Sequence, residues 1–248
     1  MSHAYDSKFM QYADTSSKHA ARTVAQGLMA KLNISSVLDV GCAKGTWLNA
    51  WRELGATDIQ GVDGDYIQRQ DLLIAQHCFA AHDLSKPLDL QRKFDLVQTL
   101  EVAEHINAAA ADTFVENLVR HSRGLILFSA APPGQGGEFH INEQVYDYWR
   151  RKFVLFGFDA YDCIRPAIAS DTSISFWYRY NMFLYAHRDY AGALPKAIAE
   201  TRVPEDQPLK DISPSLFRVR KAVIRMLPAG VREQLARLKA NFLPSGRW

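Results

Sequence analysis

The stretch SVLDVGCAKGTWLNAW, residues 36–51, decides the fold of this chain. The apolar pattern of residues 36–40 predicts a short buried strand, and Gly41 and Gly45 follow it as a tight turn. Residues 46–51 then carry large apolar side chains at the spacing of one helix face. Glycine accepts positive φ and lets the backbone approach a ligand, and the first N–H groups of a helix point into that gap. The stretch therefore predicts a cradle for a nucleotide-like ligand.

The loop of this cradle lacks two common nucleotide-binding patterns. An NAD-type fingerprint needs G-x-G-x-x-G, and the phosphate loop of NTPases needs G-x-x-x-x-G-K-[ST]; the stretch contains neither. Asp39 stands two residues before the first glycine, where its carboxylate would repel a pyrophosphate. The same carboxylate would attract a cationic ligand such as a sulfonium, which favours a different cofactor.

These residues resemble the first motif of the class I S-adenosylmethionine-dependent methyltransferases, hydrophobic-hydrophobic-Asp/Glu-hydrophobic-Gly-x-Gly-x-Gly. The chain departs from the motif only at the middle glycine, which is Ala43, a small change. The resemblance covers roughly residues 30–188 and implies an α/β fold: a Rossmann-like, doubly wound sheet of seven mostly parallel strands with an antiparallel last strand. It implies S-adenosylmethionine as cofactor, with Asp39, Gly41, Ala43 and Gly45 at its binding site.

Acidic residues follow the next two predicted strands. Asp63 ends the apolar run of residues 58–62, roughly 20 residues past the glycine turn, where one carboxylate can accept hydrogen bonds from both ribose hydroxyls. A turn-capping role is the alternative for Asp63. Asp83 follows a third predicted strand, residues 78–81, and the resemblance places it near the adenine amine, with Leu84 against the ring.

Residues 94–106, FDLVQTLEVAEHI, resemble the second methyltransferase motif, and E-x-x-E-H-I/L recurs in a small-molecule branch that includes quinone and sugar methyltransferases. Ligands of open α/β sheets bind beyond the carboxyl ends of the central strands, which puts this segment at the reaction centre. The resemblance implies that Thr99, Leu100 and Glu101 line the methionine part of the cofactor. His105 is expected either to reach the acceptor pocket or to support the loop.

Residues 130–144, AAPPGQGGEFHINEQ, are too rich in glycine and proline for regular structure and predict a loop over the pocket. The loop resembles one in small bacterial methyltransferases of surface-sugar and natural-product pathways. His140 is predicted to be the general base of an O-methylation, because histidine titrates near working pH; a loop anchor is the alternative. Glu143 is assigned to the acceptor site or to orienting His140. No metal is expected, since Glu138, His140 and Glu143 lack a tight ligand spacing.

The segment SFWYRY, residues 175–180, directly precedes the last predicted strand and recurs in the same group of methyltransferases. Trp177 or Tyr178 is expected to stack on an acceptor ring, and Arg179 to pair with a phosphate or carboxylate. The alternative is that at least two of these aromatic residues pack in the core.

Composition fits a globular enzyme. Hydrophobic residues make up 48% and charged residues 23% of the 248 residues, and no apolar run is long enough to span a membrane. The N-terminus lacks the apolar core of a signal peptide, and three scattered cysteines fit a reducing cytoplasm. Residues 1–190 are assigned to the methyltransferase domain. The first 32 residues of this domain are expected to form a helical lid over the cofactor, with Ser16 and Ser17 as the cap of one helix. Tyr5, Tyr12 and His19 are the candidates for lid contacts.

The chain changes character after residue 190. Four prolines between residues 191 and 216 predict a linker, and residues 216–238 predict basic amphipathic helices interrupted at 228–230. From Ile212 onward, eight Lys or Arg residues stand against one acidic residue, so the extension is basic and the preceding body mildly acidic. The extension is expected to contact an anionic membrane at its inner face, a protein partner or a second copy in a homodimer, or to pack on its own domain. No nucleic-acid partner is expected.

These patterns predict methyl transfer from S-adenosylmethionine to a small acceptor, a hydroxyl of a sugar or glycan intermediate, with a histidine base. Three alternatives remain open: N-methylation of an amino sugar or other metabolite, a binding module without catalysis, and an NAD-type oxidoreductase. The missing G-x-G-x-x-G pattern and the acid at Asp39 oppose the last of these.

Overall fold

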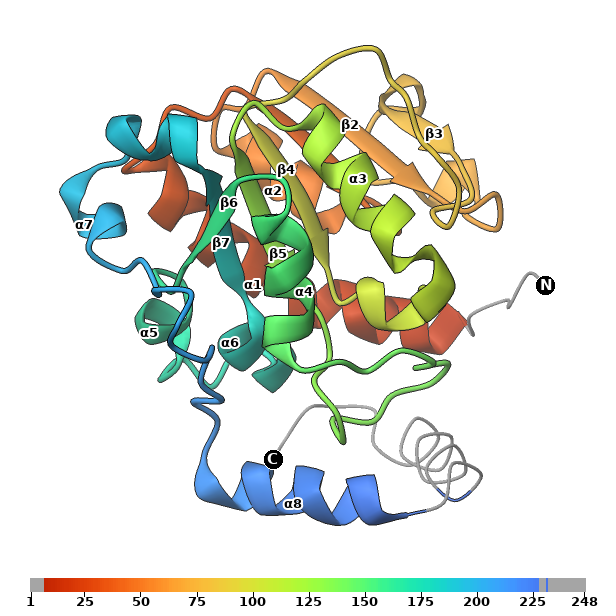
Figure 1. Ribbon diagram of the computed structural model, residues 1–248. Coiled ribbons are helices and arrows are strands. Elements are labelled where there is room, and N and C mark those ends of the chain that lie inside the picture. Colours follow the sequence, from red (N-terminus) through yellow and green to blue (C-terminus); the bar gives the residue numbers. More distant parts are fainter. Residues whose placement is uncertain (1–6, 228–230, 232–248) are drawn as a thin grey trace.

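The structure of the protein is a computed structural model, which describes residues 7–227 and residue 231. A seven-stranded sheet forms its centre, in the order β3-β2-β1-β4-β5-β7-β6 (Figure 1). Strands β1 to β5 are parallel, whereas β7 runs antiparallel to both β5 and β6. The predicted doubly wound sheet with an antiparallel last strand is therefore confirmed. The strands are β1 Ser36–Val40, β2 Asp58–Asp63, β3 Phe79–Ala81, β4 Leu96–Leu100, β5 Leu125–Ser129, β6 Phe158–Tyr161 and β7 Phe183–His187.

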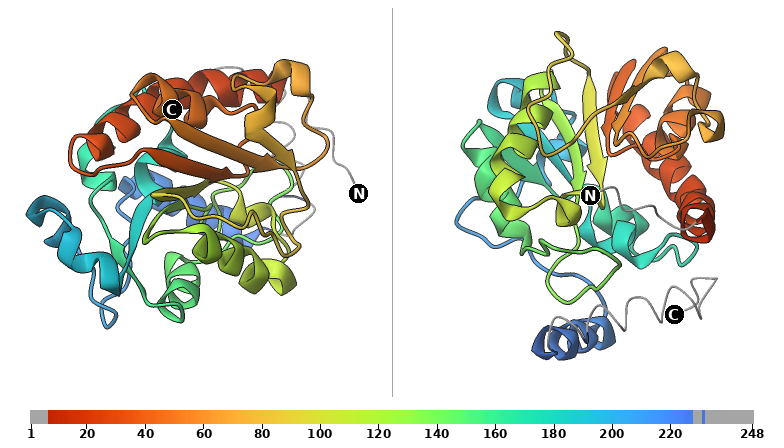
Figure 2. Two further views of the ribbon diagram at one scale, coloured as in Figure 1. Left: turned by 90° about the horizontal axis from the view of Figure 1, so that it is seen from above. Right: turned by 90° about the vertical axis from the view of Figure 1, so that its right-hand side faces the viewer.

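Helices cover both faces of the sheet, as Figure 2 shows. Helices α1 (Ser7–Met29) and α2 (Thr46–Glu53) lie on one face and bury an apolar core that contains Val24, Leu28 and Trp51. Helices α3 (Ala111–His121) and α4 (Tyr146–Val154) lie on the other face, over a core that contains Phe114 and Trp149. Because both faces are covered, every residue of β1, β4 and β5 is buried, which explains why apolar residues predominate in them without a strict alternation.

The remaining elements within the described residues are four α-helices and five 3-10 segments. They are the α-helices α5 Arg165–Ile168, α6 Phe176–Asn181, α7 Lys196–Ala199 and α8 Ser215–Met226, and the 3-10 segments Arg69–Asp71, Gln76–Cys78, Ala103–His105, Ala108–Ala110 and Arg188–Ala193.

Two local predictions were wrong. One continuous helix, α1, replaces the predicted helix start at Ser16 and Ser17, because the Ser17 hydroxyl is buried and hydrogen-bonds the Tyr178 hydroxyl at 2.9 Å instead of capping. The sequence of residues 66–75 also predicts a short helix, but these residues form turns around the 3-10 segment Arg69–Asp71, and the Leu73 N–H donates to the Lys44 carbonyl and ties the segment to the glycine loop. Among the lid candidates, His19 bonds Asp171 at 2.7 Å; Tyr5 lies outside the described residues, and so does the side chain of Tyr12.

Two buried arginines attach the linker to the body. Arg150 donates to the carbonyls of Pro204 and Gln207, and Arg165 donates to the carbonyl of Lys210. A buried guanidinium is stable only with its donors satisfied, so these bonds fix the path of the linker. Helix α8 then lies beneath the loop of residues 132–145 (Figure 1), where Arg220 donates to the Gln135 carbonyl.

The outer face of α8 is apolar. Four side chains on one face are exposed, at 83% for Leu216, 61% for Val219, 54% for Val223 and 85% for Met226. We call these four residues the α8 stripe. Among the residues that the structure describes, no helix has the length and apolar content needed to cross a membrane.

Candidate functional site

The glycine loop after β1 has the backbone of a ligand cradle. Gly41, Ala43 and Gly45 adopt φ of 89°, 47° and 84°, all in the left-handed region that glycine enters without strain. A Cβ at Gly41 would lie 2.4 Å from a methyl carbon of Val102, so no larger residue fits there without displacement. Ala43 takes a conformation in which only a small side chain is tolerated, and its N–H is used by the next strand.

Asp63 closes the cradle from the end of β2. One carboxylate oxygen accepts from the Ala43 N–H at 2.7 Å, and the other accepts from the Gly64 N–H at 2.7 Å and the Tyr66 hydroxyl at 2.5 Å. A carboxylate offers about four lone-pair sites, so one remains on the oxygen next to Ala43. Burial raises the pKa of Asp63 and outweighs these three hydrogen bonds, each of which lowers the pKa. The remaining site fits a ribose hydroxyl of S-adenosylmethionine, and both proposed roles of Asp63, turn anchor and ligand contact, are compatible.

Asp39 lies under the loop rather than beside it. The residue is 3% exposed, and burial raises its pKa to about 7. A hydrogen bond with the Gln98 side chain, on the neighbouring strand, lowers the pKa but does not outweigh burial. The nearby Asp63 carboxylate raises the pKa further. The predicted contact of Asp39 with the cofactor stays a prediction.

The other predicted cofactor residues differ in their surroundings. Thr99 and Leu100 are buried at the carboxyl end of β4, next to the glycine loop in strand order. Asp83 is exposed, and its carboxylate accepts from the Ser85 N–H at 3.0 Å and the Ser85 hydroxyl at 2.6 Å, which lowers its pKa. Leu84 packs against the second apolar core. Their adenine contacts remain predictions.

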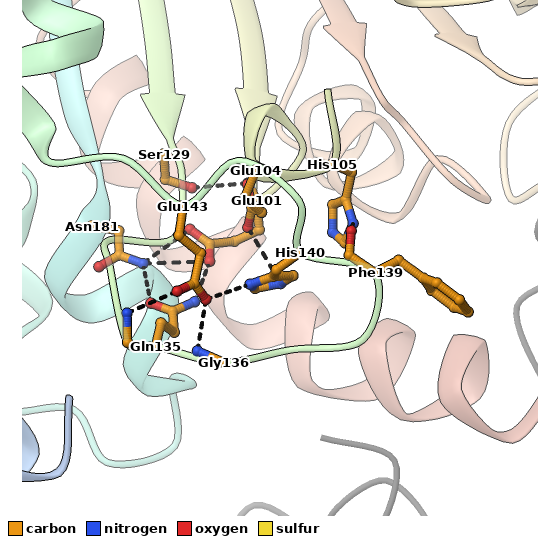
Figure 3. Close-up of polar contacts among 11 residues, drawn as sticks. Glu101, Glu104, His105, Ser129, Gln135, Gly136, Phe139, His140, Glu143 and Asn181 are labelled. Atoms are coloured by element: carbon orange, nitrogen blue, oxygen red, sulfur yellow. Dashed lines mark hydrogen bonds and ion pairs between the residues drawn. The ribbon is translucent and has the colours of Figure 1, made fainter. Parts of the chain in front are cut away.

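Glu101 begins the polar centre of the site, drawn in Figure 3. Its φ is 57°, and its N–H donates to the Ser129 hydroxyl at 3.1 Å, so the chain turns sharply at the ends of β4 and β5. Its carboxylate accepts from the Gln135 amide at 2.8 Å and from the Asn181 amide at 3.2 Å and 3.3 Å. Asn181 also donates to Gln135 at 2.8 Å. Three segments of the chain therefore meet at this carboxylate.

Glu143 holds the proline-glycine loop and His140 together. Its carboxylate accepts from the N–H groups of Gly134 and Gly136, each at 2.7 Å, and from Nδ1 of His140 at 2.9 Å (Figure 3). The His140 side chain is only 12% exposed. Burial would raise the pKa of Glu143, but its bonds with His140, Gly134 and Gly136 outweigh this and hold the pKa below its usual range. The predicted orienting role of Glu143 thus has direct contacts, whereas its acceptor contact stays a prediction.

Glu104, His105 and His140 form a compact cluster. One oxygen of Glu104 and one nitrogen of each histidine lie within 4.8 Å of one another, and Glu104 Oε1 is 3.9 Å from His140 Nε2. The two imidazoles meet edge to face, with centroids 4.9 Å apart, and His105 Nδ1 donates to the Phe139 carbonyl at 3.2 Å. Burial lowers the pKa of His105 to about 4, and burial raises the pKa of Glu104 well above its usual range, as does the Glu101 carboxylate.

The aromatic-arginine segment forms α6 and packs inward. Tyr178 is buried, bonds Ser17 of α1 and meets Trp47 edge to face at 5.2 Å. Trp177 packs against the first apolar core, and Arg179 donates to the Ala169 carbonyl at 3.2 Å. The contacts of Trp177 and Tyr178 are those of core packing, the alternative role that the sequence analysis gave. The acceptor roles of Trp177, Tyr178 and Arg179 remain predictions.

The structure adds residues that the sequence analysis did not select. Gln135 and Asn181 bind Glu101, and Glu104 joins the two histidines. Glu104 belongs to the quoted E-x-x-E-H motif, so its spacing from His105 was visible. Asn181 lies 80 positions from Glu101 and had no local signal.

Comparison with known proteins agrees with this geometry. The model of a family described as a methyltransferase domain matches residues 6–160. The magnesium protoporphyrin IX methyltransferase of Synechocystis PCC 6803, solved with bound S-adenosylhomocysteine, has a similar fold: TM-score 0.52 and 17% identity, over 73% of this chain and 93% of that one. The sugar N-methyltransferase KedS8 of Streptoalloteichus sp. ATCC 53650 gives TM-score 0.55 and 15% identity, over 76% and 95% of the two chains. Curated protein sequences give no significant match.

The family match covers the cradle, Asp63, the E-x-x-E-H motif and His140. The fold, with its antiparallel β7, agrees with the same assignment. The chain therefore belongs to the methyltransferase-domain family, within the class I enzymes that use S-adenosylmethionine.

Proposed function

We propose that this protein methylates a hydroxyl of a small polar acceptor, a sugar or glycan intermediate. The observation that carries the proposal is the position of His140 at the carboxyl ends of β4 and β5, with its ring fixed by Glu143. S-adenosylmethionine supplies a methyl group on a sulfonium, and its transfer to oxygen leaves neutral S-adenosylhomocysteine. The hydroxyl must lose its proton during that transfer, which calls for a group that removes it.

His140 is suited to promote this proton loss. A carboxylate only accepts hydrogen bonds, so the Nδ1 of His140 carries the proton of that bond and Nε2 carries the lone pair in the neutral ring. With no other ligand on Nε2, this lone pair is the base that receives the hydroxyl proton. An amine acceptor in its neutral form attacks without prior proton loss, so a fixed histidine favours a hydroxyl.

The sugar class of acceptor rests on two supports. The E-x-x-E-H motif and the proline-glycine loop resemble those of sugar methyltransferases. Gln135 of this loop and Asn181 of α6 also bring two side-chain amides to this end of the sheet, and amide groups can bond hydroxyl-rich ligands.

Paired acceptors test the proposal. Transfer of labelled methyl groups would be measured with nucleotide sugars and with their amino-sugar analogues, in which one hydroxyl is replaced by an amine. We expect label on the hydroxyl compounds, and loss of most of the rate in His140→Ala. Preferential labelling of the amino sugars at the nitrogen would contradict the proposal and favour N-methylation.

We also propose that the α8 stripe contacts the anionic inner face of a membrane. Arg218 and Arg225 stand on the same helix as the four exposed apolar side chains, which is the pattern of helices that lie in a lipid interface. Sedimentation with phosphatidylglycerol vesicles tests this: we expect binding that Val219→Glu weakens and that neutral phosphatidylcholine vesicles do not support. Wild-type binding by the variant, or a stripe-dependent dimer without vesicle binding, would contradict it.

A further inference from the structure

We propose that Glu104, His105 and His140 bind a divalent transition-metal cation. The three side chains present a carboxylate and two imidazoles, a ligand set that suits Mn²⁺, Fe²⁺ or Zn²⁺ and leaves coordination positions open for water or an acceptor oxygen. The proposal differs from the sequence-based expectation, which considered Glu138, His140 and Glu143 and found no site.

The carboxylate of Glu104 provides the first argument. Its side chain is 1% exposed, and within the described part of the chain neither of its oxygens accepts a hydrogen bond of normal geometry, although the backbone N–H groups of Glu104 and Ala131 lie close enough to lower its pKa. A buried carboxylate with such weak donors carries a large desolvation cost, which it avoids by binding a proton or a cation. The oxygens face two histidines rather than an apolar wall, and this surrounding favours a cation.

The histidines provide the second argument. His105 donates through Nδ1 to the Phe139 carbonyl, and His140 donates through Nδ1 to the Glu143 carboxylate. Metal-binding histidines almost always donate their other ring N–H to a carbonyl or carboxylate in this way, which fixes the tautomer and the ring. In each neutral ring the lone pair is then on Nε2, and for His140 that atom faces Glu104.

The distances require little movement. In a tetrahedral site with ligand atoms about 2.1 Å from the metal, two ligand atoms are about 3.4 Å apart. The Glu104–His140 distance of 3.9 Å exceeds this value by about 0.5 Å, and all three ligand atoms lie within 4.8 Å of one another. A shift of about 1 Å or less in each side chain therefore suffices to bring the three atoms to bonding distance.

Charge provides the last argument. Glu101 and Glu143 lie next to the cluster, so three largely buried carboxylates surround two imidazoles. Burial raises the pKa of Glu101 and of Glu104, and a divalent cation would favour the ionised carboxylates and offset their negative charge in a region that water reaches poorly.

Cation binding needs no acceptor and does not depend on the proposed function. If the protein both binds the cation and methylates a hydroxyl, the role of His140 in the reaction changes. The histidine then acts as a ligand. Coordination to the cation would lower the pKa of the acceptor hydroxyl, so that its proton passes to water as the methyl group moves to oxygen. Metal dependence of the methyl transfer rate would then accompany binding.

The test is Mn²⁺ binding to the full chain after chelator treatment, without methyl donor or acceptor, followed by electron paramagnetic resonance. We expect one bound Mn²⁺ per chain and nitrogen modulation from imidazole ligands in the pulsed spectrum. Glu104→Gln should weaken binding by about tenfold or more, whereas the control Glu138→Gln, on the loop that carries His140, should stay within about twofold of wild type.

Binding of S-adenosylhomocysteine, for which neither Glu104 nor Glu138 is a predicted contact, shows that each variant is folded. Three results would overturn the proposal: no stoichiometric binding of Mn²⁺ or Zn²⁺ by the wild type, bound Mn²⁺ without nitrogen modulation, or equal affinity in Glu104→Gln. Methyl transfer without metal dependence, combined with metal binding, would leave the site in place and contradict only its link to catalysis.

Discussion

The substitution Glu143→Gln tests how the site is held together. The Glu143 carboxylate accepts from Gly134 and Gly136 at 2.7 Å each and from His140 at 2.9 Å, with Gly134 on one oxygen and the other two donors on the second. A glutamine has one acceptor oxygen, so its amide N–H group must face at least one of these donors. Two donors then oppose each other in a largely buried site.

The size of the effect follows from this mismatch. A buried donor left without an acceptor costs about 1–3 kcal/mol, and 1 kcal/mol shifts the midpoint of thermal unfolding by about 2–4 °C in a chain of this size. We therefore expect Glu143→Gln to lower the unfolding temperature by about 2–12 °C. His140 would also lose its fixed orientation, and a displacement of about 1 Å can reduce a catalytic rate about 100-fold.

Two assays separate these effects. Differential scanning fluorimetry gives the unfolding temperature, and steady-state methyl transfer gives kcat and the KM for S-adenosylmethionine. The KM should change little, because the cradle of Gly41 to Gly45 shares none of the three Glu143 bonds. Glu138→Gln, on the same loop, is the control for charge removal. A wild-type unfolding temperature together with a wild-type kcat would refute the role given to Glu143.

Three further substitutions test other parts of the structure. Asp63→Asn should weaken binding of S-adenosylhomocysteine by about tenfold in calorimetry, because it replaces one acceptor oxygen of the cradle; unchanged affinity would contradict the ribose contact. Asp39 has a folded pKa of about 7, above its unfolded value, so its stability contribution is present below about pH 4 and is lost as pH rises through 7. Asp39→Asn should therefore gain stability relative to wild type across that window, and a constant difference in denaturant titrations would contradict the burial argument. Burial would raise the pKa of Asp95, but hydrogen bonds from Ser35 and Arg123 outweigh it and hold the pKa well below its usual range. Asp95→Asn should therefore have a lower free energy of unfolding than wild type at neutral pH. This difference should shrink as pH falls below about 4.

The sequence predicted the sheet because its central strands are mostly apolar and are followed by glycine or acidic residues. Residues 36–51 alone contain β1, the positive-φ turn and the start of α2. Helix boundaries were less predictable where tertiary contacts override the local preference of the sequence. Ser17 has the composition of a helix cap, yet Tyr178, 161 positions away, takes its hydroxyl and leaves it inside α1.

The candidate site divides in the same way. Residues adjacent in sequence to strand ends, such as Asp63 and Glu101, were predictable because parallel strands deliver their carboxyl ends to one edge. The bonds of Asn181 and Gln135 to Glu101 were not, because they depend on how α6 and the proline-glycine loop fold back over the sheet. The E-x-x-E-H spacing showed that Glu104 and His105 are neighbours, but only the structure brings His140 to them.

The most direct test of the account is transfer of a labelled methyl group from S-adenosylmethionine into separated acceptor pools: nucleotide sugars and glycans, other small metabolites, protein, and nucleic acid. The account predicts label in the sugar and glycan pool, on oxygen, and loss of that label in Asp63→Ala. Label in protein or nucleic acid would contradict the small-acceptor assignment. Absence of label from every pool, in a protein that still binds S-adenosylhomocysteine, would contradict catalysis on these acceptors and favour a binding module.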